Sequence, residues 1–266
     1  MTGIGMVWMI FEAKALIAGI MLAVASYQDF RTREIDDKVW LIGGGLGGAL
    51  TAYEALFTPA YPYLLAGFSI GITAALAFGV YYLGLYGGAD AKALLAIALT
   101  FPLAPSWITS PLFPIAVLGN SLLLSVLLLI PTCLALNLAW KVSGRSLFDG
   151  VEAPWVKKAA AMLTGVRVRP AIARKVHFNL MEVPAPKCES AGNVQGGGGE
   201  ENDGNERVRL KLFSRVTDED EEKVIDDRRD YVWVTPAIPM IVFFLAGYIS
   251  ALLGWDILFA VVSLLI

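Results

Sequence analysis

The chain has 266 residues, of which 56% are hydrophobic and only 17% are charged. Soluble domains are about 45–50% apolar and about 25% charged, so this chain has too few polar residues to cover a water-facing globule of its size. The composition excludes a soluble enzyme, a secreted disulfide scaffold and a disordered tail, and it predicts an all-α polytopic membrane protein. The formal net charge of −3 indicates no class of partner, and we expect no nucleic-acid partner.

Apolar residues gather in runs long enough to approach or cross a hydrocarbon core of about 30 Å. The runs predict about six transmembrane helices, at residues 4–27, 38–57, 62–86, 91–107, 112–140 and 236–266. Five glycines in the second run, between Gly43 and Gly48, favour close packing against other helices. In the last run, Gly254 followed by Trp255 and Asp256 predicts a break, with a short re-entrant or interfacial tail after it.

Positive charges predict the orientation of these helices. Of the 21 Lys and Arg residues, 16 lie between Lys141 and Arg229, three lie in 28–38, and one is Lys92; Lys14 is the exception. Cytoplasmic loops of membrane proteins carry such an excess of positive charge. We therefore predict a multi-pass protein of the cell membrane with its N-terminus outside, and with three segments in the cytoplasm: 28–37, 87–91 and 141–235.

The long polar stretch divides the chain into three predicted parts. Residues 1–140 form a membrane domain with the first five helices, 141–235 form a cytoplasmic soluble loop domain, and 236–266 form a C-terminal transmembrane helix. Within the loop, residues 146–180 mix apolar and basic side chains and are expected to pack as a small domain. Residues 191–206 have the composition of a flexible linker, and 208–213 alternate like a β-strand.

Four further charged residues fall within or beside the apolar runs. Glu12 and Lys14 are two positions apart, so they do not face each other on a helix. Glu54 and Asp256 fall on the predicted outer side, at or near the interface. Charges inside a membrane are candidates for function by default, but we interpret these four as charges without a catalytic role.

The cysteine and histidine content limits the chemistry. Cys133 and Cys188 are too few for a disulfide framework. Paired Cys-x-x-Cys zinc ligands are absent from the sequence, and the one histidine, His177, makes a histidine-built metal site or a Ser-His-Asp triad improbable. We expect no metal and no cofactor, which leaves carboxylate chemistry.

Two aspartates have the right placement for such chemistry. Asp29 lies at the cytoplasmic end of the first predicted span, and Asp90 lies at the start of the fourth. The predicted topology puts both at the same depth, and two neighbouring carboxylates can share one proton, as in aspartic proteases. The competing interpretation is structural: Asp29 is then an interfacial charge beside arginines, and Asp90 is a helix N-terminal charge favoured by the dipole.

The residues around Asp90 support the catalytic interpretation. Gly87 and Gly88 carry no side chain and Ala89 carries a small one, so an extended substrate backbone could approach the carboxylate closely. Lys92 is two residues past Asp90 and need not pair with it directly. Its expected role is to orient lipid headgroups, the substrate or the two aspartates.

The segment Gly87-Gly88-Ala89-Asp90 resembles the Gly-x-Gly-Asp motif of membrane aspartic proteases. It is most similar to the form with a hydrophobic residue before the aspartate, found in archaeal preflagellin peptidases, which are relatives of bacterial type IV prepilin peptidases. Asp29-x-Arg31-x-Arg33-x-Ile35 resembles the first aspartate segment of that family, and 154–165 and 235–239 resemble further family features.

The resemblance implies a membrane aspartic endopeptidase with Asp29 and Asp90 as its catalytic residues. Its substrates would be preflagellins (archaellins) and type IV pilin-like precursors, cut at the cytoplasmic face where the short basic leader meets the hydrophobic segment. Glu34, Asp36 and Asp37 could attract a basic leader. The chain lacks the cysteine-rich zinc domain of the bacterial enzymes and a glycine motif for a methyl donor, so methylation is not expected.

Two other functions remain open at this point. A non-enzymatic carrier or channel would use Asp29 and Asp90 to bind a cation or relay protons, although an internal repeat and charges at the bilayer midplane would then be expected. A presenilin-like or signal-peptide-peptidase-like protease would cut within the bilayer, and Pro236-Ala237-Ile238 weakly resembles an element of that group. The expected partners are precursor proteins and the lipid bilayer, and the sequence carries no signal for an oligomeric state.

Overall fold

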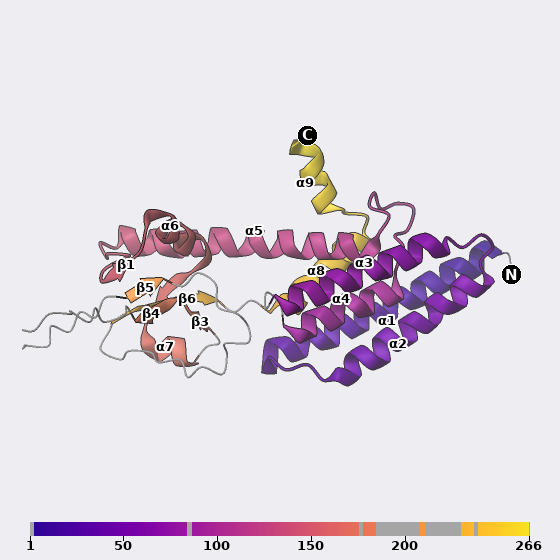
Figure 1. Ribbon diagram of the computed structural model, residues 1–266, viewed down its shortest axis with the longest axis horizontal. Helices are drawn as coiled ribbons and strands as arrows, with labels where there is room; N and C mark the ends of the chain where they lie inside the picture. Colours follow the sequence, from indigo (N-terminus) through magenta and orange to yellow (C-terminus); the bar gives the residue numbers. More distant parts are fainter. Residues whose placement is uncertain are drawn as a thin grey trace, which may run out of the picture. The chain divides into compact units, whose positions relative to one another are not determined.

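The computed structural model describes residues 3–83, 87–175, 178–184, 208–210, 230–236 and 239–265. The chain forms two compact units, one of Met1–Leu127 with Ile238–Ile266 and one of Leu128–Ala237 (Figure 1). The predicted linker at 191–206 and most of the acidic stretch before Asp230 lie outside the described residues.

The first unit is built from helices, and each predicted apolar run overlaps at least one of them. They are α1 (Gly3–Thr32), α2 (Asp37–Phe57), α3 (Tyr63–Tyr82), α4 (Gly88–Thr100), the first half of α5 (Phe113–Val142), α8 (Met240–Leu252) and α9 (Ile257–Leu265). The short α4 packs against α1, α2, α3 and α8, so it forms the centre of this bundle (Figure 1). Small residues in α4 permit this enclosure, since Ala93, Ala96 and Ala98 are fully or almost fully buried.

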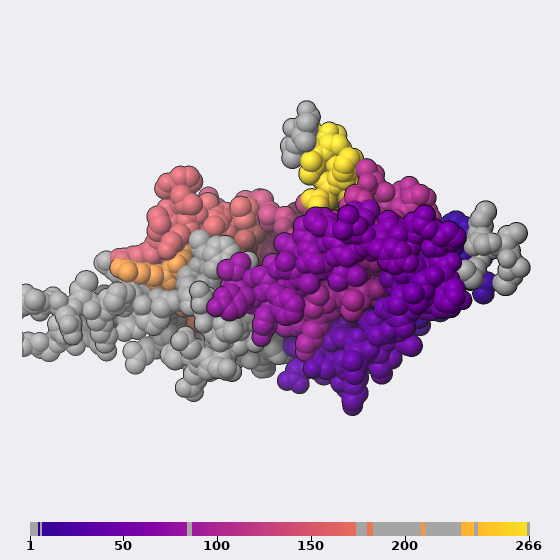
Figure 2. All heavy atoms as spheres, turned by 45° about the vertical axis from the view of Figure 1, so that its right-hand side comes forward, coloured from indigo at the N-terminus to yellow at the C-terminus, as the bar shows by residue number. Residues whose placement is uncertain are grey.

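Three described helices are long and apolar enough to cross a membrane, within Val7–Thr32, Tyr63–Tyr82 and Phe113–Val142. A fourth candidate is the pair α8 and α9, which bends by 76°. These helices make the chain a multi-pass membrane protein. The predicted break in the last run is confirmed, because α8 ends at Leu252 and Gly254 adopts a φ of +83° that favours glycine. Figure 2 shows α9 standing out from the other helices of its unit.

The remaining two predicted spans correspond to α2 and α4. Glycines lower the hydropathy of α2, and the 13 residues of α4 extend only about 20 Å. The fourth run was predicted to reach residue 107, but its helix ends at Thr100. Pro102 explains the difference, because the residue before a proline is driven out of helical geometry. The count of six spans stays a prediction.

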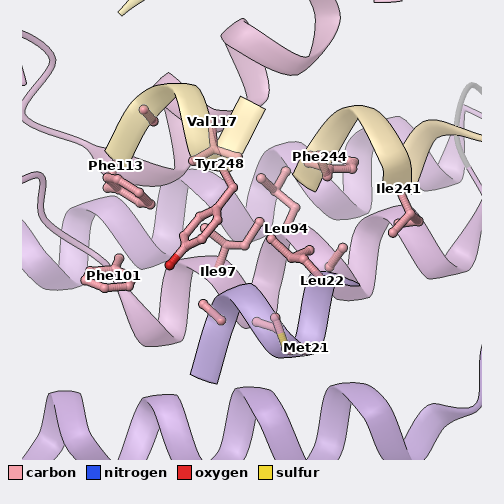
Figure 3. Packing of buried hydrophobic residues seen from close by; sticks show 14 of the residues in the cluster. Met21, Leu22, Leu94, Ile97, Phe101, Phe113, Val117, Ile241, Phe244 and Tyr248 are labelled. Atoms are coloured by element: carbon pink, nitrogen blue, oxygen red, sulfur yellow. The ribbon is translucent and has the colours of Figure 1, made fainter. Parts of the chain in front are cut away.

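Aromatic and aliphatic side chains from α1, α4, α5 and α8 form the core of the first unit (Figure 3). The ring of Tyr248 packs against Phe113 with centroids 5.8 Å apart, and Phe113 packs against Phe101 at 5.0 Å. The hydroxyl of Tyr248 donates a hydrogen bond to the carbonyl oxygen of Ala15 at 2.9 Å, so its polar atom is satisfied inside the bundle. This contact ties α8 to the middle of α1.

Glycines bring α2 into close contact with α1 and α4, as the sequence predicted. A Cβ atom at Gly43 would overlap the side chain of Met21 on α1, and one at Gly47 would overlap the side chain of Thr100 on α4. Next to Gly47, the hydroxyl of Thr51 donates to the Thr100 carbonyl oxygen at 2.7 Å. The α2–α4 contact therefore combines close backbone approach with an interhelical hydrogen bond, as is common inside membranes.

Replacement of Gly47 by alanine should destabilise this contact, because the added methyl group collides with Thr100. We expect a loss of about 1–3 kcal/mol, seen as a lower midpoint of thermal unfolding of the purified protein. Gly45→Ala is the matched control, since a Cβ there meets nothing within 4 Å and alanine favours the helix. Equal midpoints for the two variants would contradict the packing described here.

The embedded charges differ from the sequence interpretation, which gave them no partner within the protein. Lys14 on α1 and Glu54 on α2 form an ion pair with Nζ and Oε2 2.8 Å apart. The spacing of 40 residues carries no local pattern that could have revealed it. Asp256 accepts hydrogen bonds from the backbone N–H groups of Ser110 and Phe259, both at 3.1 Å, and so caps the start of α9.

The second unit combines the end of α5 with two short helices and two small sheets. Its elements are β1 (Val151–Glu152), α6 (Trp155–Thr164), β2 (Val166–Val168), α7 (Pro170–Lys175), β3 (Phe178–Leu180), β4 (Glu182–Pro184), β5 (Val208–Leu210) and β6 (Val232–Pro236). The strand orders are β1-β5-β4 and β2-β6-β3. The strand predicted at 208–213 is present as β5, and its last three residues lie outside the described part of the chain. Trp233 is fully buried and anchors the core of this unit.

Candidate functional site

Asp29 lies in the last turn of α1 and is mostly buried, with 13% of its side chain exposed. The backbone N–H of Ile241, at the start of α8, interacts with this carboxylate. The hydroxyl of Ser26, one turn earlier, donates to the carbonyl oxygen of the same Ile241 at 3.2 Å. These two contacts hold the end of α1 against α8 and limit the positions open to the Asp29 side chain.

The turn after Asp29 is shaped by Arg33. Arg33 has a φ of +60°, and its backbone N–H donates to the Asp29 carbonyl oxygen at 3.2 Å, which closes the helix end. Its Nη1 lies 4.0 Å from Oδ1 of Asp29. The chain then enters α2 at Asp36, whose Oδ1 accepts from the backbone N–H of Lys38 at 3.0 Å as an N-cap.

Asp90 is the third residue of α4 and is partly buried. Its Oδ2 accepts a hydrogen bond from the backbone N–H of Gly87, the N-cap residue, at 3.2 Å. The carboxylate thus lies at the positive end of the helix dipole, which favours negative charge there. The sequence predicted that Asp90 lies at the start of a helix, and this position is confirmed.

The structure brings Asp29 and Asp90 to the same end of the first unit. They come from different helices, α1 and α4, which pack against each other, and the charge of Asp29 acts on the carboxyl group of Asp90. Two carboxylates in such proximity, away from bulk water, repel each other and favour retention of one proton between them. The arrangement can therefore offer an acid and a base side by side.

The small residues before Asp90 have no explanation in the packing of the described chain. A Cβ atom at Gly87 would lie 3.7 Å from Oδ2 of Asp90, and one at Gly88 would lie 3.6 Å from Tyr81, which are ordinary contacts. Neither glycine has a positive φ. Ala89 packs against the hydrophobic core of the unit. The described packing and backbone conformation therefore do not require glycine at either position.

Lys92 forms an ion pair with Asp37, the first residue of α2, with Nζ 2.5 Å from Oδ1. The contact links the start of α2 to the first turns of α4, two residues after Asp90. Sequence reasoning left the partner of Lys92 open, and with 55 residues between the two charges no local spacing could have identified it.

Metal ligands do not gather at this site. Within the described ranges, no three His, Cys, Asp or Glu side chains are grouped in a way that could hold a metal ion. His177 and Cys188 lie outside those ranges. The expectation that the chain uses neither a metal nor a cofactor stays a prediction.

Comparison with known proteins finds sequences similar to this chain. The sequence pattern of the Type IV leader peptidase family matches residues 16–135, which include both aspartates. The chain is also similar to three preflagellin peptidases along most of its length. The one from Methanococcus maripaludis is 24% identical over 238 residues, with 85% of this chain and 88% of the relative covered. The chain is therefore similar to the type IV leader peptidase family over residues 16–135, and to these peptidases over most of its length.

The other two relatives extend the match. The preflagellin peptidase of Methanococcus voltae is 26% identical and covers 86% of this chain and 89% of its own length. The preflagellin peptidase of Methanocaldococcus jannaschii is 26% identical, and the match covers 90% of this chain and 93% of the relative. Each relative is matched over most of its own length, so the similarity to these peptidases extends along most of the chain.

Arg33 keeps a backbone conformation that costs an ordinary residue about 1–2 kcal/mol. Arg33→Gly should therefore leave the thermal unfolding midpoint equal to or above that of the parent protein. Arg31→Gly is the contrast, because Arg31 is helical and glycine there costs about 1 kcal/mol. A similar decrease for both variants would mean that side-chain contacts of Arg33 outweigh the strain.

Proposed function

We propose that this chain is a membrane aspartic endopeptidase that removes the short basic leader from preflagellins and type IV pilin-like precursors. The observation that carries the proposal is the placement of Asp29 and Asp90 at one end of the helical unit, close enough for their charges to interact. The names of the relatives supply the substrate class. Both aspartates act as catalytic residues in this proposal.

The proposed reaction uses the two carboxyl groups as one acid–base unit. The ionised carboxylate takes a proton from a water molecule, whose oxygen attacks the carbonyl carbon of the scissile bond, while the protonated carboxyl donates to the carbonyl oxygen. The tetrahedral intermediate then breaks its C–N bond, and a proton passes to the departing amine. The Ile241 N–H and the Gly87 N–H hold the two side chains during these steps.

Gly87 and Gly88 fit a role in substrate approach. Because neither is required by the conformation or packing of the described residues, their lack of side chains leaves room for an extended peptide beside Asp90. The exposed Glu34 lies near this end of the unit and favours a basic leader. Asp37 contributes less, because Lys92 already neutralises it.

The cytoplasmic face is the proposed location of cleavage. Positive charges cluster beside Asp29 and in the long polar loop, which indicates that this end faces the cytoplasm. A site at the helix ends meets a precursor where its hydrophobic segment leaves the membrane, so the leader need not enter the bilayer. A carrier is less well supported, because its charged groups would be expected near the bilayer midplane.

Asp29→Asn and Asp90→Asn should each abolish cleavage of a pilin-like precursor while expression and membrane insertion remain unchanged. An amide can neither take a proton from water nor share one, and the two residues act as a unit, so the losses should be similar and at least about 10³-fold. Cleavage is followed by the mass shift of the precursor in membranes.

Asp36→Asn, Asp37→Asn and Asp256→Asn are the matched controls and should retain substantial activity. Asparagine can still cap α2 at position 36, accept from Lys92 at position 37, and cap α9 at position 256. Substantial cleavage by either Asp29→Asn or Asp90→Asn would remove the aspartic mechanism and favour the carrier hypothesis.

Chelators should have no effect on the cleavage rate. The sequence holds one histidine and two distant cysteines, which are too few to assemble a catalytic zinc site. The rate is measured before and after prolonged treatment with EDTA. Loss of activity that added zinc restores would contradict the metal-free mechanism.

A further inference from the structure

A hollow lies in the first unit, far from the two aspartates. It has a volume of about 400 Å³ and is lined by residues from the first half of α1, the end of α2, the α2–α3 turn and the segment after α4. Lys14 in this hollow precedes Asp29 by 15 residues on the same helix, a separation of about 22 Å along α1. The hollow is therefore separate from the proposed catalytic site.

A partly buried ion pair forms one wall of the hollow. Lys14 is only 4% exposed, and its ammonium group donates to Glu54 at 2.8 Å. An ammonium has three N–H donors, and the described chain accepts one of them. The Lys14 Nζ also lies 4.8 Å from the centre of the Phe101 ring. Since buried polar groups are normally satisfied, the remaining donors point to a ligand with acceptor atoms.

Two hydroxyl groups near the pair also lack partners among the described residues. Within the described ranges, the hydroxyl of Tyr61 has no hydrogen-bond partner, and Oγ1 of Thr58 is buried without one. Burial and the nearby Glu54 carboxylate raise the pKa of Tyr61 above its ordinary value, so the phenol stays neutral and can both donate and accept. The hollow thus offers ammonium donors, carboxylate acceptors and hydroxyl groups together.

Aromatic rings form the other walls. Trp8 and Trp107 stack with ring centres 5.7 Å apart and planes 6° apart, and Phe11 meets Trp107 edge-on at 5.3 Å. The two tryptophans are 50% and 43% exposed, so this aromatic wall reaches the outside of the unit. Tryptophan gathers where membrane meets water, which is the level at which lipid headgroups lie.

The combination of charges selects the class of ligand. Lys14 and Glu54 cancel each other, so an anion is repelled by Glu54 and a cation by Lys14. A neutral group with several hydroxyls satisfies both charged residues and Tyr61, and its C–H faces can lie on the aromatic rings. We propose that this hollow binds a neutral polyhydroxy ring, a sugar, presented either as the headgroup of a glycolipid or as a free sugar.

The test uses the full chain in phosphatidylcholine nanodiscs, with the midpoint of thermal unfolding as the measurement. A ligand that binds the folded state raises this midpoint in a saturable manner. The probes are monoglucosyl diacylglycerol, phosphatidic acid at the same mole fraction, and free glucose. We expect a saturable rise with the glucosyl lipid and none with phosphatidic acid. An equal rise with free glucose assigns the site to a soluble sugar, and a rise with the lipid alone assigns it to a headgroup.

Two variants make the result specific. Tyr61→Phe should raise the glucosyl probe concentration needed for half of the shift by about three- to tenfold, through loss of one hydrogen bond. Tyr53→Phe is the matched control, because Tyr53 lies on α2 outside the hollow and should have no effect. Glu54→Gln should reverse the charge preference, so that phosphatidic acid now raises the midpoint.

Three results would overturn the proposal. They are no saturable shift with either glucosyl probe, an equal shift of the parent protein with phosphatidic acid, and equal behaviour of Tyr61→Phe and Tyr53→Phe. The Tyr61 comparison stands even if Glu54→Gln does not fold, because Tyr61→Phe removes no hydrogen bond within the described chain.

Discussion

The close approach of α2 to α1 and α4 is the constraint on which the rest of the first unit depends. Gly43 lets α2 meet Met21 on α1, and Gly47 lets it meet Thr100 on α4. With little hydrophobic drive between helices inside lipid, such small-residue contacts supply the packing energy. They enclose the short α4, which could not span a bilayer alone, and so hold Asp90 near the end of α1 where Asp29 lies.

The first unit carries charged side chains at both ends, and they interact differently at each end. At one end, the backbone N–H groups of Ile241 and Gly87 hold two like charges that repel each other. At the other, Lys14 and Glu54 attract each other, and a partly buried pair of this kind costs much of what it gains by leaving water. A costly pair beside unpartnered hydroxyls suggests a binding role beyond joining α1 to α2.

Sequence reasoning reached the features that local pattern encodes. Apolar runs predicted the helices, glycines in α2 predicted close packing, and Gly254 predicted the break between α8 and α9. The choice of Asp29 and Asp90 depended on family resemblance as well as on position. Contacts such as Lys14 with Glu54 were missed, because pairs far apart in sequence depend on how helices turn about their axes. The early end of α4 was missed because an apolar run continues past the helix that Pro102 terminates.

The central claim is that Asp29 and Asp90 lie together in the folded protein. The most direct test places cysteines at both positions in a chain with Cys133→Ala and Cys188→Ser, and treats it in membranes with a short bifunctional methanethiosulfonate reagent. Mass spectrometry of the digested protein then detects linked peptides. The account predicts an intramolecular link between positions 29 and 90 and none between 12 and 90, since Glu12 lies about 25 Å along α1 from Asp29. No link at 29 and 90, or equal linking of both pairs, would contradict it.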